Sequence, residues 1–138
     1  MSLNYWLLKT EPENDWSWTQ QIKKGTEGWD GVRNYTARKN MLEMKIGDQA
    51  FFYHSGKERR IMGIVEIVKK AYPDKTDILK KFVMVDVKTT ISLPTPVTLK
   101  IIKNESTLMD MQLVRNSRLS VQSVTTNEWK KICKLGGL

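Results

Sequence analysis

The chain has 138 residues, a length that fits one domain with its own hydrophobic core. Its 23 Lys and Arg residues outnumber 15 Asp and Glu residues, so the net charge is +8, and 40% of the residues are hydrophobic, a balance that argues against disorder. One cysteine, one histidine and no apolar run near the roughly 20 residues of a membrane span exclude a disulfide framework, a metal site of several histidines and a transmembrane protein.

The first third of the chain predicts one strand and two helices. Residues 4–8 are aromatic and aliphatic and predict a short buried strand that stops before Pro12. Residues 15–24 begin with cap-type side chains and end at Gly25, which is typical of a short helix. After a turn at residues 29–31, a broken apolar stripe over residues 32–44 predicts the second helix.

The middle of the chain is rich in aromatic and β-branched residues, which favour strands. Residues 49–54 and 61–70 predict two strands, and alternation over residues 82–91 predicts a third. A basic loop separates the first two strands, and a second loop runs from Tyr72 to Lys81. The prolines within residues 93–96 predict a break in the chain.

The last third predicts a short helix over residues 97–103 and two strands over residues 110–115 and 119–124. Thr125 and Glu128 have the spacing of a capping box, so we expect a final helix that ends at Gly136 and Gly137.

Together these elements predict a single α+β domain over residues 1–138. About five or six strands form a curled sheet or small mixed β-barrel, and the short helices lie around it. The opening sequence lacks the cationic start of a secretory signal, so we expect a cytoplasmic protein.

The positive charge and five tryptophans favour nucleic acid as the partner over an anionic membrane surface. Flat aromatic side chains beside cations suit stacking on bases. The simpler alternative is that the positive charge only keeps a lysine-rich chain soluble.

Four clusters carry candidate binding residues. In the first, alternation places Trp6 and Leu8 on one face of a strand, and Lys9, Thr10 and Glu11 emerge at the strand end, where side chains reach a cleft. The simpler interpretation is that Trp6 belongs to the core and Lys9 pairs with a carboxylate.

The second cluster runs from Trp29 through a tight turn to a helix start. Asn34 can hydrogen-bond a base edge as donor and acceptor, and Arg33 and Arg38 can meet phosphate at a helix N-terminus. Alternatively, Asn34 closes a turn and the arginines are solvated.

The third cluster places Tyr53, His54 and Ser55 at the end of an aromatic strand, which is typical of a pocket floor with a polar rim. The fourth holds Arg115, Ser117 and Arg118 between two predicted strands, where they make a plausible phosphate contact.

Taken in order, these motifs resemble the EVE domain family. The matching segments are Y-W-L-L-K-T-E-P, W-D-G-V-R-N-Y-x-A-R, M-K-x-G-D-x-x-F-F-Y-H-S, G-I-V-x-I-V-K-x-A-Y-P-D, V-D-V and S-R-L-S-V. The resemblance implies a PUA-like fold, related to YTH readers of methylated adenine and to ASCH domains. It also implies binding of a modified base, notably modified cytosine, in DNA or RNA, with no cofactor and no metal.

The matching motifs imply the site residues. The base pocket is expected to contain Trp6, Lys9, Trp29, Asn34, Tyr35, Tyr53, His54 and Ser55. The phosphate contacts are expected at Arg33, Arg38, Arg115, Ser117 and Arg118. We expect a non-catalytic module, monomeric, with nucleic acid as its partner and no membrane.

The main alternative is an enzyme. ASCH relatives include small amidohydrolases that act on modified cytidine through pocket Lys, Thr and Glu residues. Lys9, Thr10 and Glu11 offer those side-chain types, with Glu66 as another carboxylate. Three successive strand residues cannot all face one point, which disfavours this alternative. A pure protein-interaction domain is a third possibility, disfavoured by the basic charge.

Overall fold

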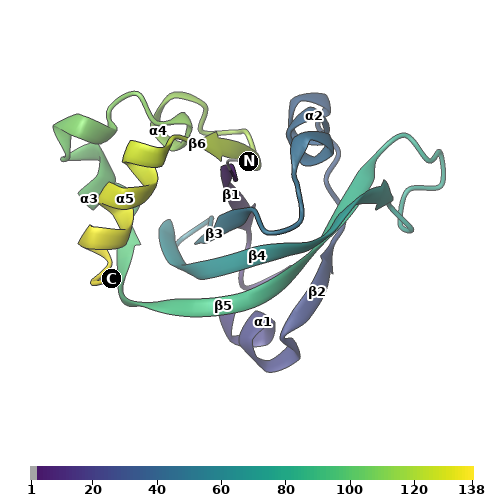
Figure 1. The fold of residues 1–138 in the computed structure, drawn as a ribbon, viewed down its shortest axis with the longest axis horizontal. Coiled ribbons are helices and arrows are strands. Elements are labelled where there is room, and N and C mark those ends of the chain that lie inside the picture. The colour runs from purple at the N-terminus through teal and green to yellow at the C-terminus, as the bar shows by residue number, and fades with distance from the viewer. Residues whose placement is uncertain (1–2) are drawn as a thin grey trace.

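Six strands form one mixed sheet in the computed structural model, which describes residues 3–138 (Figure 1). The strands are β1 (Tyr5–Thr10), β2 (Thr26–Trp29), β3 (Gln49–His54), β4 (Arg60–Pro73), β5 (Val83–Thr98) and β6 (Val121–Val124). Their order is β2-β5-β4-β3-β1-β6; β1 and β3 are parallel, and the other neighbours are antiparallel.

The predicted α+β class is confirmed. The predicted barrel is not closed, because β2 and β6 are the two edges of the sheet and do not pair with each other. The long strands β4 and β5 bend where bulges shift their register, which curls the sheet (Figure 1).

Within residues 3–138, five α-helices and one 3₁₀ turn lie around the sheet. They are α1 (Trp18–Lys24), α2 (Tyr35–Glu43), α3 (Leu99–Lys103), η1 (Ser106–Leu108), α4 (Gln112–Arg115) and α5 (Thr126–Leu135). Capping boxes at Ser17 and Thr125 start α1 and α5, as the sequence predicts for Thr125. Figure 1 shows α3, α4 and α5 gathered at one end of the sheet and α2 near the other.

Alternation along the strands builds two cores, one on each face of the sheet. Leu7 and Phe51 belong to the core under α5, while their neighbours Leu8 and Phe52 belong to the core that also holds Trp29. In the α5 core, Trp129 stacks between Phe51 and Tyr5, with ring centroids 3.9 and 4.4 Å away.

The predicted break at residues 93–96 is wrong, because β5 continues to Thr98. Ser92 lies opposite Gly63 and Val97 opposite Ile61, so both prolines fall in a bulge where no ladder donor is needed. The helix expected from residue 97 therefore starts at Leu99, capped by Thr98.

Two other expectations are also corrected. Trp29 was expected in a turn, but it ends the short strand β2. Residues 110–115 were expected as a strand, but they contain the helical turn α4. Within residues 3–138, we find no helix with the length and apolarity to cross a bilayer.

Candidate functional site

A cavity of about 220 Å³ lies where β1, β2 and the segment before α1 meet. We call it the tryptophan cavity; its lining residues are Lys9, Thr10, Asp15, Trp16, Glu27, Gly28, Trp29, Asp30, Gly31, Val32, Arg33 and Ser120. The cavity thus combines two indoles with carboxylates and two cations.

The segment before α1 is fixed by side-chain hydrogen bonds. The Thr10 hydroxyl donates to the carbonyl of Trp16 at 2.8 Å, and the Trp16 indole N–H donates to Gln21 Oε1 at 2.8 Å. Two residues after Trp16, the backbone N–H of Trp18 donates to His54 Nε2 at 2.9 Å. These bonds hold the Trp16 wall against the ends of β1 and β3.

The two tryptophans contribute differently to the cavity. Trp29 is only 6% exposed, and its ring meets Phe52 edge-on at 5.5 Å, so most of it is core. Trp16 is half-buried and packs against the same core cluster. Trp16 therefore offers the more accessible aromatic surface.

The carboxylates gather on one side of the tryptophan cavity. Burial raises the pKa of Asp30, and the nearby carboxylates of Asp74, Glu27 and Asp15 raise it further. A carboxylate here accepts hydrogen bonds, and its protonated form can also donate one.

Lys9 also lines the tryptophan cavity. Burial lowers the pKa of its ammonium group. Its Nζ donates to the carbonyl of Ser117 at 2.7 Å and lies 5.8 Å from the centroid of the Tyr53 ring. Lys9 is thus a positioned donor whose charge is only partly solvated.

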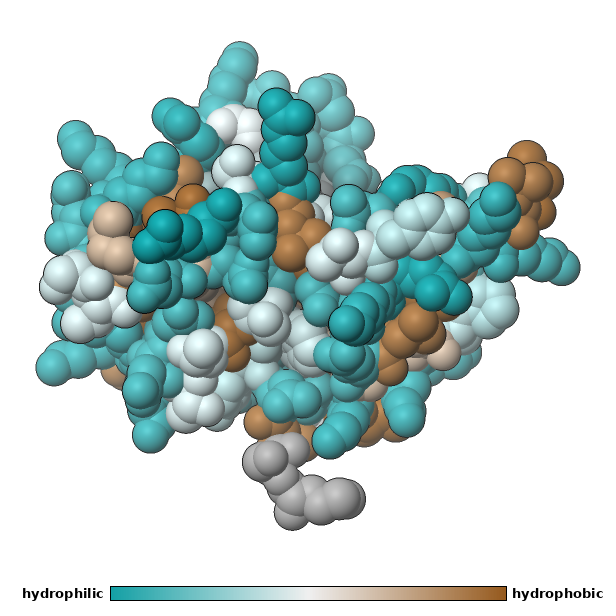
Figure 2. All heavy atoms as spheres, turned by 90° about the horizontal axis from the view of Figure 1, so that it is seen from above, coloured by the Kyte–Doolittle hydropathy of each residue, from teal (hydrophilic) through white to brown (hydrophobic). Residues whose placement is uncertain are grey.

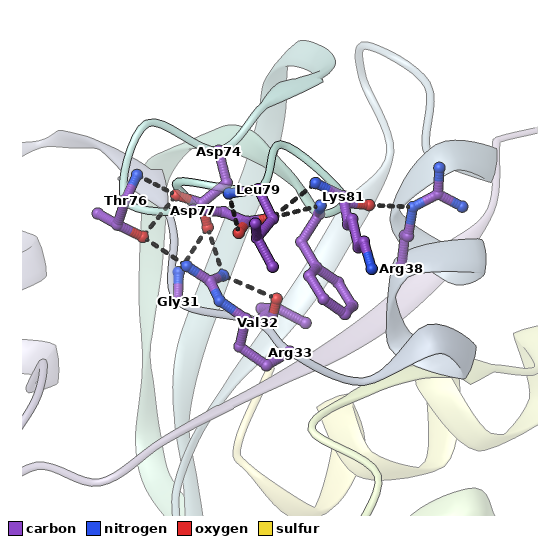
Figure 3. Close-up of polar contacts among 10 residues, drawn as sticks. Gly31, Val32, Arg33, Arg38, Asp74, Thr76, Asp77, Leu79 and Lys81 are labelled. Carbon is purple, nitrogen blue, oxygen red and sulfur yellow. Dashed lines mark hydrogen bonds and ion pairs between the residues drawn. The ribbon is translucent and has the colours of Figure 1, made fainter.

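Arg33 connects the cavity to the loop after β4 (Figure 3). Its Nη1 donates to Asp74 Oδ2 at 2.9 Å, and its Nη2 donates to the Thr76 hydroxyl at 2.9 Å. Asp74 Oδ2 also accepts from the backbone N–H of Gly31 at 2.8 Å. Burial opposes ionisation of Asp74, but hydrogen bonds from Thr76, Arg33 and Gly31 outweigh it and lower its pKa to about 2.

Two more open cavities adjoin the tryptophan cavity. The arginine groove, of about 480 Å³, is lined by Asn34, Thr36, Arg115, Asn116, Ser117, Arg118 and Leu119. The tyrosine cavity, of about 290 Å³, is lined by Lys9, Tyr53, Ser55, Gly56, Arg59, Leu99, Lys103, Leu113 and Ser117. Lys9 joins the tryptophan cavity to the tyrosine cavity, and Ser117 joins the tyrosine cavity to the arginine groove. The tryptophan cavity and the arginine groove are lined by chain neighbours, Arg33 beside Asn34 and Ser120 beside Leu119, so the three lie side by side.

Five of the eight predicted pocket residues line one or more of these cavities. Trp29 and Lys9 line the tryptophan cavity. Tyr53 and Ser55 line the tyrosine cavity, and burial raises the pKa of Tyr53 to about 12. Asn34 borders the arginine groove, but its Oδ1 caps α2 by accepting from Ala37 N–H at 2.9 Å.

The other three predicted pocket residues line none of these cavities. Trp6 is buried, and its indole N–H donates to Asp48 Oδ2 at 2.9 Å. His54 is buried and accepts at Nε2, so its proton sits on Nδ1, 2.9 Å from Glu58 Oε1. Tyr35 is 64% exposed, with its ring 5.0 Å from that of Phe82.

The predicted phosphate contacts also differ in availability. Ser117 and Arg118 line the arginine groove. Arg115 lines it too, but Arg115 forms an exposed pair with Asp110 at 2.7 Å. Arg38 donates from Nε to the carbonyl of Lys81 at 2.8 Å, so it braces the loop after β4.

Sequence reasoning did not single out Trp16, Asp30 or Ser120 as lining residues. The available signal was the D-W-S-W segment, in which the Ser17 cap places Trp18 on the helix and leaves Trp16 outside it. For the enzyme alternative, Lys9 and Thr10 line the tryptophan cavity, whereas Glu11 and Glu66 do not. Among residues 3–138, no group of three or more His, Cys, Asp or Glu side chains is placed to hold a metal ion.

Comparison with known proteins places this arrangement in a family. The EVE domain model matches residues 4–135. Thymocyte nuclear protein 1 of Danio rerio is 38% identical over 167 residues, which covers 97% of this chain and 72% of the relative.

Solved structures agree with this match. Rpa0253 from Rhodopseudomonas palustris is 53% identical, with a TM-score of 0.92 over 98% of this chain and 94% of that chain. Human THYN1, in complex with DNA containing 5-methylcytosine, is 34% identical, with a TM-score of 0.91 over 98% of both chains. The YTH domain of Zygosaccharomyces rouxii MRB1, bound to N6-methyladenosine RNA, shares the fold at 19% identity and a TM-score of 0.58 over 98% of this chain and 87% of that chain. From the family match and these identities, we conclude that this chain belongs to the EVE domain family.

Proposed function

We propose that this protein binds nucleic acid and holds a modified base, with modified cytosine as the preferred ligand, in the tryptophan cavity. One observation carries the proposal: the cavity is walled by Trp16 and Trp29, is lined by the carboxylates of Asp15, Glu27 and Asp30, and adjoins the basic arginine groove. The complex of the human relative with DNA containing 5-methylcytosine supports the same ligand class.

The size of the cavity suits a single base. Its volume of about 220 Å³ lies below the range of roughly 300–1,000 Å³ that is typical of pockets for drug-sized ligands. A base must leave its stack to enter such a site, which costs a few kcal/mol, and stacking on an indole can return ~1–3 kcal/mol.

The charged side chains at the two sites favour different parts of a nucleotide. Carboxylates accept hydrogen bonds from the exocyclic amine of cytosine, so Asp30 is placed to read that edge. The same carboxylates repel phosphate, which is drawn instead to Arg118 and its neighbours in the arginine groove. The base therefore enters the cavity while its backbone stays outside.

Replacing Trp16 with alanine is the direct test of the base site. We expect the affinity for an oligonucleotide with 5-methylcytosine to fall about tenfold, because one stacking wall is lost. Fluorescence anisotropy with short labelled single strands and duplexes measures this affinity. Trp16→Phe keeps an aromatic wall and is expected to retain most of it.

Thermal unfolding separates a binding effect from a folding effect. Trp16 is only half-buried, so we expect the alanine variant to stay folded at the temperature of the assay. An Ala variant that is folded and keeps the full affinity for the oligonucleotide with 5-methylcytosine would rule out the tryptophan cavity as the base site.

Replacing Arg118 with glutamine tests the phosphate contact. Each phosphate that a protein neutralises on duplex DNA adds about 0.9 to the slope of log K against log salt, so we expect the slope to fall by about that amount. Lys130→Gln on α5 is the matched control, since this exposed lysine lines none of the three cavities. Equal slopes for Arg118→Gln and the wild type would place the backbone elsewhere.

One observation keeps an amidohydrolase as the second candidate function. Lys9 has a lowered pKa and lines the tryptophan cavity together with Thr10. Incubation with N4-acetylcytidine followed by chromatography tests it. We expect no product; turnover that disappears in Lys9→Ala would favour the enzyme.

A further inference from the structure

The loop between β4 and β5, residues 74–82, exposes two large aliphatic side chains next to each other at its tip. Ile78 is 93% exposed and Leu79 is 72% exposed. Figure 1 shows this loop projecting at one end of the molecule, and Figure 2 shows a cluster of hydrophobic atoms projecting at that same end. Adjacent aliphatic residues so fully in water indicate a contact with a partner rather than packing within the fold.

The tip is held in a defined shape. The Asp77 carboxylate accepts hydrogen bonds from the backbone N–H groups of Leu79 (3.1 Å), Lys81 (2.7 Å) and Phe82 (2.8 Å), as Figure 3 shows in part. Lys80 adopts a φ of 53°, a left-handed conformation that a side chain rarely takes without local support. The loop therefore presents Ile78 and Leu79 in a fixed direction instead of folding them back.

The base of the loop is joined to the tryptophan cavity. Asp74 binds Gly31 and Arg33, and both of these residues line the cavity. On the other side of the loop, Arg38 of α2 donates to the carbonyl of Lys81. The tip is thus positioned relative to the base site by direct hydrogen bonds.

The surroundings of the tip are cationic. Lys75, Lys80 and Lys81 lie within the loop and are all exposed. In a duplex, two phosphate backbones border a hydrophobic stack of bases. Cations on either side of the apolar tip are therefore complementary to the phosphates, and the tip itself is complementary to the bases.

We propose that Ile78 and Leu79 act as a wedge that enters a base step of double-stranded nucleic acid next to the base held in the tryptophan cavity. This inference rests on the proposed function. Extracting a base leaves a gap in the stack, and inserted aliphatic side chains such as Ile and Leu cover the faces of the unstacked neighbours. The three lysines hold the phosphates on either side.

The test is the double variant I78S/L79S. We expect its affinity for a short duplex with one 5-methylcytosine to fall about tenfold, because the gap is no longer filled. Its affinity for the same modified strand without a complement is expected to stay within about twofold, because no duplex stack has to be opened. Both side chains are exposed, so the unfolding temperature is expected to be unchanged.

A second readout reports on the base step itself. 2-Aminopurine placed beside the 5-methylcytosine of the duplex fluoresces more strongly when it is unstacked, and we expect the wild type, but not the double variant, to raise its signal. Ile46→Ser is the matched control, because Ile46 is 60% exposed and lies outside the loop. It is expected to behave as the wild type in both assays.

The outcomes of these assays distinguish a failure of the wedge proposal from a failure of the proposed function. Wild-type affinity and 2-aminopurine signal in I78S/L79S would overturn the wedge and leave the base site standing, as would an equal loss on single strand and duplex. Binding to phosphatidylserine vesicles that is lost in the double variant, with duplex binding unchanged, would assign the tip to a membrane. A wild type that binds neither form of the oligonucleotide would overturn both proposals.

Discussion

Replacing Gly63 with alanine is expected to destabilise the fold by about 3 kcal/mol, at the upper end of the cost of overpacking. A Cβ at this position in β4 would lie 2.2 Å from Trp18 Cζ2 and 2.7 Å from the backbone oxygen of Ile91. Trp18 cannot move aside freely, because its indole N–H donates to the Ser92 hydroxyl at 2.8 Å and its backbone N–H donates to His54.

Urea unfolding followed by circular dichroism measures this loss. Gly28→Ala is the matched control in β2: its Cβ would meet the flexible end of Met84 at 2.3 Å and otherwise make ordinary contacts, so we expect a smaller cost, below about 1 kcal/mol. Equal stability of the Gly63 variant and the wild type would show that Trp18 is not tightly held. Since Trp16 precedes Trp18 by two residues, we also expect weaker base binding in the Gly63 variant.

Replacing Asp74 with asparagine is expected to lower the free energy of unfolding at pH 7 by at most about 2 kcal/mol. The asparagine keeps one acceptor but turns its amide donors toward Arg33 and Gly31, which are donors themselves. The magnitude follows from the pKa of Asp74, which is about 2 in the folded chain against 3.8 for the unperturbed group.

The stabilisation that Asp74 contributes depends on pH. Because the folded pKa is depressed, the stabilisation is fully present above the unfolded value near 4 and is lost as the pH falls through the folded value near 2. We therefore expect the stabilities of the wild type and Asp74→Asn to differ at pH 7 and to converge near pH 2. Urea unfolding at several pH values measures the difference.

Asp110→Asn is the matched control, because Asp110 also pairs with an arginine, at 2.7 Å, but both side chains are mostly exposed. We expect a cost below about 0.5 kcal/mol, as for other exposed ion pairs. A gap between wild type and Asp74→Asn that persists at pH 2 would assign the stabilisation to packing instead of charge.

Local rules predicted the elements that depend on local signals. The helix after Thr125 and the strand over residues 49–54 have the predicted character, because capping and aromatic content act over a few residues. β2 was missed because Thr26–Trp29 is four residues long and contains a glycine; it is a strand only because β5 pairs with it. The continuation of β5 past two prolines depends on a bulge opposite β4, which is a tertiary feature.

The candidate site shows the same division. The sequence indicated the strand ends that carry Lys9 and Tyr53, but it could not assign them to two adjoining cavities. Trp6 and His54 match the family motifs, but both side chains are buried. Trp6 hydrogen-bonds Asp48, 42 residues away in the chain, and His54 accepts from Trp18, 36 residues away. Such distant partners leave no periodic signal, so burial of these two side chains was not predictable from their neighbours.

The position of β1 between β3 and β6 constrains how the protein is made. β1 is the first strand of the sheet in chain order, yet its antiparallel partner, Val121–Val124, is the last strand of the sheet. The nascent chain must therefore carry an unpaired, apolar strand edge until Val121–Val124 has been made. Ser117 and Ser120, which complete the walls of the cavities, arrive only just before that strand, so binding of a ligand cannot assist the earlier steps of folding.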